Sequence, residues 1–342
     1  MDSVTIKDIA KKCGVSVSTV SRAINDYPGV SQSTKNMIME AVRENQFIPN
    51  NSARNLKRLE SNSIVVLVKG IGNPFFQPMI SILEKKIHAH KYTFILQSVN
   101  DNEDEIEVAL EMILEKKPKG IIFLGGYFYH TEEKLRQLTI PCVIGAVGGM
   151  DRKNSKIFSS VHVDDVKESY KIVDYLCRAG HRRIAFFAAS REDRSIGALR
   201  LSGYRAALSD NGLPVVEELI CYSGPEEDAY SMERGYHGAR RLLERGIEWT
   251  AVYAISDSVA IGICRALKEA GKSIPEEYSV VGFDGLEIAS YYIPTITTVK
   301  QPVEEMAEDV ADILFDTIEN NAPVQHRIFE GELLIRESSG RI

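Results

Sequence analysis

From Ser61 onward, short apolar runs alternate with amphipathic segments, and this alternation restricts the fold more than any other feature. The runs are four to six residues long and rich in Val and Ile, at residues 64–68, 94–99, 120–124, 142–147, 184–189, 220–223, 251–256 and 279–283. Such runs are typical of strands that are buried on both faces of a parallel sheet. Helical periodicity separates them at residues 77–89, 105–115, 166–179, 198–211 and 258–270. The sequence therefore predicts doubly wound α/β sheets.

Two interruptions divide this α/β region into near-equal halves. One is the irregular stretch at residues 148–158, and the other is the proline-containing segment Tyr291-Tyr292-Ile293-Pro294. A chain of 342 residues has room for two or three domains. We therefore expect two α/β lobes and a smaller N-terminal domain.

Composition narrows the class of protein. The chain is 44% hydrophobic and 26% charged, as in ordinary globular domains. No apolar run approaches the roughly 20 residues of a membrane helix, and Met1–Asp8 lacks the apolar core of a signal peptide. We expect a cytoplasmic protein with no membrane partner.

Signals for enzymatic chemistry are weak. The five cysteines (Cys13, Cys142, Cys177, Cys221 and Cys264) lie far apart without a Cys-x-x-Cys pair, so we expect buried thiols and no metal site. Gly70-Ile71-Gly72 lacks the third glycine of a dinucleotide loop. Neither a P-loop nor a nucleophile elbow occurs, so we expect no enzyme and no cofactor.

Charge is distributed unevenly along the chain. Residues 1–60 have a balance of +3, whereas the remaining 282 residues have a balance of −10. An anionic polymer is therefore expected to bind only at the N-terminal head.

Three short helices are predicted in this head. Thr5 and Asp8 have the spacing of a capping box, and Ser16 begins a second helix after the break at Gly14. A third helix begins near Ser31 or Thr34 and runs to about residue 45. A helix, a short turn and a second helix with a polar outer face form the helix-turn-helix pattern.

The outer face of the second helix suits DNA. It carries Val17, Ser18, Ser21 and Arg22, and hydroxyl groups bind phosphate oxygens while an arginine can donate two hydrogen bonds to guanine. A three-helix interaction module with solvated polar faces is the alternative.

Residues 4–56 resemble the DNA-binding head and hinge of the lactose/galactose repressor family. The head matches over Thr5-Ile6-Lys7-Asp8-Ile9-Ala10 and Gly14-Val15-Ser16-Val17-Ser18-Thr19-Val20-Ser21-Arg22-Ala23-Ile24-Asn25, and the hinge over Phe47-Ile48-Pro49-Asn50 and Ala53-Arg54-Asn55-Leu56. The core matches at Asn73-Pro74-Phe75-Phe76, Arg200-Leu201-Ser202-Gly203-Tyr204, Val280-Val281-Gly282-Phe283-Asp284 and Thr297-Thr298-Val299-Lys300-Gln301-Pro302.

The resemblance implies a set of DNA contacts. Val17, Ser18 and Arg22 would read bases in the major groove. Phosphate contacts would come from Ser16, Thr19, Ser21, Asn25, Ser31 and Thr34, and Thr5, Asn50, Ala53 and Arg54 complete the DNA-binding set. A hinge helix at about residues 51–59 would enter the minor groove, with Leu56 as an apolar wedge.

The resemblance also implies the organisation of the core, as two lobes similar to periplasmic sugar-binding proteins. The head would span residues 1–49 and the hinge 50–60. With crossovers near Val161, Tyr292 and Pro323, the N-terminal lobe would span 61–161 and 293–322, and the C-terminal lobe 162–292 and 323–342.

An effector site is expected in the cleft at the carboxyl ends of the strands. The effector-binding residues implied are Asn73, Phe75, Arg200, Tyr230, Asp257, Asp284 and Gln301. Alternatively, Asp257 and Asp284 cap helices, and Phe75 or Phe76 belongs to the core. Residues 145–149 carry no charge, so a frequent polar contact to the effector is missing.

These features together predict a dimeric repressor of carbohydrate genes that binds a pseudo-palindromic operator. Its effector is expected to be a sugar or glycoside, and the alternatives are a nucleobase or nucleoside, or a phosphoprotein co-regulator. The competing classes are an α/β enzyme and a plain periplasmic binding protein.

Overall fold

The computed structural model describes residues 5–24, 27–45, 62–100, 103–126, 130–148, 157–224 and 227–342. The chain divides into two compact units, Met1–Ser61 and Asn62–Ile342.

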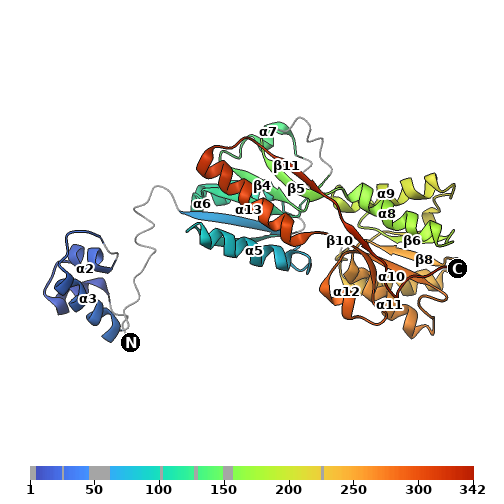
Figure 1. Ribbon diagram of the computed structural model, residues 1–342, viewed down its shortest axis with the longest axis horizontal. Coiled ribbons are helices and arrows are strands. Elements are labelled where there is room, and N and C mark those ends of the chain that lie inside the picture. The colour runs from blue at the N-terminus through green and yellow to red at the C-terminus, as the bar shows by residue number, and fades with distance from the viewer. Residues whose placement is uncertain are drawn as a thin grey trace. The chain divides into compact units, whose positions relative to one another are not determined.

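The described residues of the N-terminal unit form three helices, as the capping residues predict (Figure 1): α1 (Ile6–Cys13), α2 (Val17–Ile24) and α3 (Gln32–Glu44). The Asp8 carboxylate accepts hydrogen bonds from the backbone N–H and the hydroxyl of Thr5, at 2.9 and 2.6 Å. The Ser16 and Ser31 hydroxyls accept from the N–H groups three residues later. A small apolar core centred on Ile9, Val20 and Ile38 holds the helices together.

Two six-stranded sheets form the second unit, which confirms the predicted doubly wound lobes. The first sheet has the order β11 (His326–Phe329), β5 (Ser159–Val163), β4 (Cys142–Gly145), β3 (Gly120–Leu124), β1 (Ser63–Lys69) and β2 (Thr93–Val99). The second has the order β12 (Glu332–Leu334), β10 (Thr297–Lys300), β9 (Ser279–Asp284), β8 (Ala251–Ala254), β6 (Ile184–Phe187) and β7 (Ile220–Cys221). All pairings are parallel except that of β10 with β12.

Helices cover both faces of each sheet (Figure 1). Helices α5 (Phe76–Ala89) and α13 (Val303–Asn320) cover one face of the first sheet, and α6 (Glu105–Lys116) and α7 (Glu132–Leu135) cover the other. The second sheet lies between α8 (Asp165–Arg178) with α9 (Ile196–Asp210), and α10 (Met232–Glu244) with α11 (Asp257–Glu269). The short helix α12 (Glu287–Tyr291) follows β9. The inner strands β1, β3, β4, β6, β8 and β9 are buried on both faces, which is why their sequences are largely apolar rather than alternating.

The chain crosses between the lobes at places different from those expected. Strand β10 pairs with β9 in the second sheet, so the second crossing follows Lys300 rather than Tyr292. Strand β11 pairs with β5 in the first sheet, so the third crossing lies at Glu330-Gly331 rather than near Pro323. The first crossing, after β5, lies close to the expected Val161. The expected positions came from the resemblance, and the matched motifs do not determine which sheet β10 or β11 joins.

None of the described helices is long and apolar enough to cross a membrane. All five cysteines are free thiols; Cys142, Cys177 and Cys264 are buried, but Cys13 and Cys221 are partly exposed.

Candidate functional site

The outer face of α2 presents the side chains expected to read DNA. Val17, although apolar, is 42% exposed, and Ser18 and Arg22 are also exposed. The Ser16 hydroxyl lies 2.7 Å from that of Ser18 and 2.8 Å from that of Thr19, which places three hydroxyls at the start of the helix. A helix N-terminus that presents hydroxyls at the surface is suited to phosphate oxygens.

The remaining DNA-contact candidates divide into two groups. Thr5, Ser21, Ser31 and Thr34 are exposed or partly exposed. Asn25, Asn50, Ala53, Arg54 and Leu56, with the expected hinge helix at residues 51–59, lie outside the described residues.

A cavity of about 820 Å³ lies in the second unit and is lined by residues of both lobes. Its wall comes from the carboxyl ends of strands, where parallel sheets place their ligands. Lys69 ends β1, Val99 ends β2 and Gly125 follows β3 in the first lobe. Ala189 and Ser223 follow β6 and β7 in the second.

Only two of the seven expected effector residues line this cavity, namely Asn73 and Tyr230. Phe76 lines it rather than Phe75, although both rings are buried and meet edge to face at 5.4 Å. The Asn73 side chain accepts a hydrogen bond from the Phe75 N–H at 3.1 Å. The Tyr230 hydroxyl oxygen is buried, and Ser195 lies near it.

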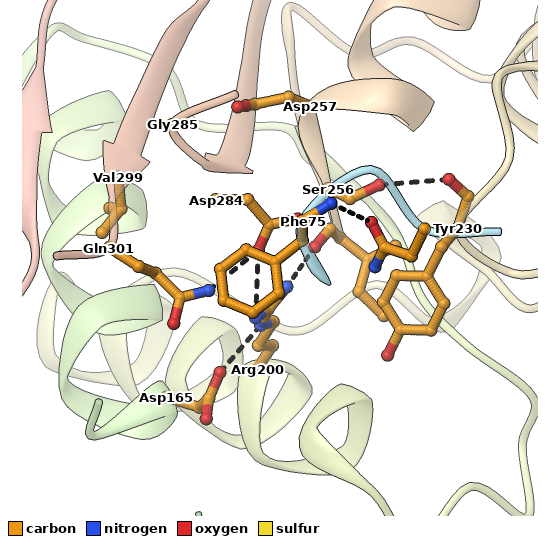
Figure 2. A network of polar contacts seen from close by, with 12 residues as sticks. Phe75, Asp165, Arg200, Tyr230, Ser256, Asp257, Asp284, Gly285, Val299 and Gln301 are labelled. Carbon is orange, nitrogen blue, oxygen red and sulfur yellow. Dashed lines mark hydrogen bonds and ion pairs between the residues drawn. The ribbon is translucent and has the colours of Figure 1, made fainter. Parts of the chain in front are cut away.

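Three of the other expected residues meet in a buried network (Figure 2). Arg200, only 1% exposed, donates from Nε to Asp165 at 2.9 Å and from Nη1 to the Ile255 carbonyl at 2.6 Å. Its Nη2 lies 3.4 Å from Oδ1 of Asp284, which also accepts from the Gln301 amide at 2.9 Å. The guanidinium carbon lies 3.7 Å from the centre of the Phe283 ring.

Asp284 combines a raised pKa, a carboxylate oxygen without a hydrogen bond in the described part of the chain and a positive backbone φ. Burial raises the pKa of Asp284 to about 6 against the opposing charge of Arg200. Its Oδ2 atom is buried without a hydrogen bond among the described residues. Its φ of 105° lies in the region that favours glycine, and backbone strain of this kind is concentrated at ligand sites.

Asp257 does not cap its helix, because Ser256 provides the cap of α11. Instead, Oδ2 of Asp257 accepts a hydrogen bond from the Leu286 N–H at 2.7 Å and so anchors the loop after β9. Burial, reinforced by the charge of Asp284, raises the pKa of Asp257 to about 8.

We expect Asp257→Asn to flatten the dependence of stability on pH. Because the folded carboxyl has the higher pKa, the folded state retains a proton that the unfolded state releases, and stability falls as pH rises from about 4 to about 8. The slope is at most about 1.4 kcal/mol for each pH unit. Urea unfolding between pH 5 and pH 8 measures it, with the exposed Glu276→Gln as the control. Identical slopes in the wild type and Asp257→Asn would contradict the assignment.

Sequence reasoning missed several polar residues of the cavity wall: Lys69, Ser98, Asn100, Ser190, Asp193, Ser195 and Glu227. Most of them lie at or just beyond a strand end. The carboxyl ends of the predicted strands, rather than the family resemblance, would have identified these residues. Lys69 is held in place because its Nζ donates to the Glu103 carbonyl at 2.6 Å and lies 3.5 Å from Glu105.

Known proteins resemble the chain over its whole length. The model of bacterial regulatory proteins, lacI family, matches residues 5–50, and that of the periplasmic binding protein-like domain matches residues 173–339. HTH-type transcriptional regulator MalR of Clostridium butyricum is 38% identical over 335 residues, which cover 97% of this chain and 98% of that protein. HTH-type transcriptional repressor CytR of Escherichia coli K12 is 30% identical over 340 residues, with coverage of 98% and 96%.

Solved structures agree in fold. The complex of the transcriptional regulator CelR with cellobiose has a TM-score of 0.69 at 27% identity and covers 98% of this chain and 100% of that one. The Lac repressor dimer bound to operator has a TM-score of 0.77 with 99% of each chain covered, but at 24% identity it shows the fold alone.

A helix-turn-helix unit and a core like a periplasmic binding protein define a DNA-binding transcriptional regulator rather than an enzyme. The chain belongs to the lacI family of bacterial regulatory proteins.

Proposed function

We propose that this regulator represses carbohydrate-utilisation genes and that a sugar-like effector in the 820 Å³ cavity changes its affinity for the operator. The observation that carries the proposal is the polar wall contributed by both lobes. Sugar hydroxyls both donate and accept hydrogen bonds, and the amides, hydroxyls and carboxylates of this wall can pair with them. The complex of the related regulator CelR contains cellobiose, which supports an effector of this class.

The seven expected effector residues form two layers in this proposal. Asn73 and Tyr230 contact the effector directly from opposite lobes. Asp284 does not line the cavity in this structure and its Oδ2 is buried, so we propose that a movement on effector binding brings the unpaired Oδ2 to an effector hydroxyl. The charges of Arg200 and Asp284 both act on the pKa of Tyr230, as expected of neighbouring groups. The supporting layer then consists of Phe75, Arg200, Asp257 and Gln301.

Thermal unfolding in the presence of a ligand panel tests the proposed effector class. The panel contains monosaccharides, disaccharides and nucleosides, and operator affinity is measured again with each ligand that raises the melting temperature. Stabilisation by a sugar together with a change in operator affinity supports the proposal. Stabilisation by nucleosides alone would overturn the sugar assignment.

The active form is proposed to be a dimer on a pseudo-palindromic operator. A single head of three helices offers little surface for DNA, and two copies related by a two-fold axis match two half-sites. The solved Lac repressor complex is likewise a dimer bound to operator.

Arg22→Ala is expected to cost about 1–3 kcal/mol of binding to the correct operator and to relax base choice at one position. The reason is that Arg22 is exposed on the outer face of α2, where a guanidinium can reach a guanine edge. Fluorescence anisotropy with matched and mismatched operators provides the measurement. Arg43→Ala removes the same charge from the last turn of α3 and serves as the control. Equal losses on all operators for Arg22→Ala would show a phosphate contact instead.

A further inference from the structure

A second cavity, of about 260 Å³, lies in the C-terminal lobe among the loop after β6, strand β7 and helix α10. It shares no lining residue with the larger cavity. Four arginines belong to its wall, namely Arg191, Arg234, Arg241 and Arg245. Guanidinium groups repel one another unless an anion lies between them.

Arg234 is the buried member of the group, with a side chain that is 1% exposed. Its Nη2 donates to the Cys221 carbonyl and lies 3.5 Å from the Ala188 carbonyl, so this nitrogen ties β7 to the end of β6. Its Nη1 is buried and has no hydrogen-bond partner within the described residues. A buried, charged donor without a partner is costly and indicates a missing acceptor.

Carboxylates within the described residues do not balance the charge of this wall. Glu227 is shared, since it lies 3.3 Å from Nε of Arg234 and 2.9 Å from Nη2 of Arg241. Glu217, which lines the cavity, pairs at 2.8 Å with Arg205, which does not. Burial lowers the pKa of Arg234, and Arg241 lowers it further, as expected of an undercompensated cation.

The two other arginines are available to a ligand. Arg191 and Arg245 are exposed and form no ion pair with any described residue. The Arg191 guanidinium lies 4.3 Å above the Tyr222 ring, which holds it at the cavity wall.

We propose that this cavity, the arginine pocket, binds a compact phosphate-class anion, either free phosphate or the phosphoryl end of a phosphomonoester. Guanidinium groups donate pairs of parallel hydrogen bonds to phosphate oxygens. The volume lies below the roughly 300–1,000 Å³ of typical small-molecule sites, so it suits an ion or an end group rather than a whole sugar.

A purely structural role for these arginines explains fewer of the observations than a bound anion does. The bonds of Arg234 to the Ala188 and Cys221 carbonyls account for Nη2, but leave Nη1 without an acceptor. They also give no reason for Arg191 and Arg245 to line the same small space.

Titration calorimetry on the full chain tests the proposal, with inorganic phosphate and glycerol phosphate as probes at constant ionic strength. The test variant is Arg191→Gln/Arg245→Gln, which leaves both ion pairs of Glu227 intact. The matched control, Arg194→Gln/Arg240→Gln, removes the same charge at exposed positions outside the pocket. Unchanged unfolding midpoints show that both variants fold.

We expect saturable binding of at least one probe to the wild type and the control, and binding at least tenfold weaker in the test variant. Tighter binding of glycerol phosphate identifies a phosphomonoester, whereas equal or tighter binding of inorganic phosphate identifies the free ion. No saturable binding of either probe, or equal affinities in the test variant and the wild type, would overturn the proposal. Sugar binding to the larger cavity is measured separately, so the two proposals fail independently.

Discussion

Replacing Arg200 with alanine is expected to lower the free energy of unfolding by about 3–5 kcal/mol. The guanidinium is buried between Asp165 and Asp284, and its removal leaves two carboxylates without their cation in the interior of the C-terminal lobe. Loss of packing against the Phe283 ring adds to the effect. Urea unfolding followed by circular dichroism measures the change.

The matched control lies on the same helix. Arg205→Ala in α9 breaks an exposed ion pair with Glu217 and is expected to cost about 0–1 kcal/mol. If both substitutions cost the same, the buried network contributes nothing beyond a surface ion pair. In that case the burial of Arg200 with Asp165 and Asp284 would not be accounted for by stability.

Asp284→Asn is expected to abolish the effect of the effector on operator affinity, a change of about 5–150-fold in the responsive protein. An effector shifts the conformation only by its differential affinity for the two states, and the unpaired Oδ2 is proposed to provide part of that difference. Asparagine tolerates the positive φ of this position better than alanine does, and the unfolding midpoint shows whether the variant folds despite its lost ion pair with Arg200. Operator binding is measured by fluorescence anisotropy with and without the effector identified by the ligand panel.

Operator binding without the effector is expected to be unchanged in Asp284→Asn, because the head has its own apolar core and all proposed DNA contacts precede residue 60. Glu287→Gln removes an exposed negative charge three residues later and serves as the control. A fully responsive Asp284→Asn variant would show that the effector binds without this carboxylate.

The elements of the fold were predictable because their signals are local. The capping side chains at Thr5, Ser16 and Ser31 mark the starts of three helices, and the structure confirms all three. Strands β1–β4 and β6–β9 are likewise visible as apolar runs, but the buried strands β5 (SSVHV) and β10 (TTVK) are too polar to be seen in this way. Strand β10 shows the limit of this reasoning, because the partner of a strand depends on contacts distant in the sequence.

The candidate site was less predictable than the fold. Asp284 ends β9 and Gln301 follows the neighbouring strand β10, so their meeting at 2.9 Å could be anticipated from parallel topology. Arg200 is enclosed with Asp165, whereas Asn73 and Tyr230 line the larger cavity. This difference depends on how side chains from separate segments pack together. The sequence carries no local signal for such packing.

The order in which the chain is synthesised matters for a protein connected in this way. Strands β11 and β12 lie at the edges of different sheets and are separated only by Glu330 and Gly331. A ribosome that has produced residues 62–320 has therefore completed neither sheet, even though all the inner strands are present. Both lobes acquire their last strand within the same few residues of translation, so until then β5 and β10 expose edges, later covered, to chaperones or to other nascent chains.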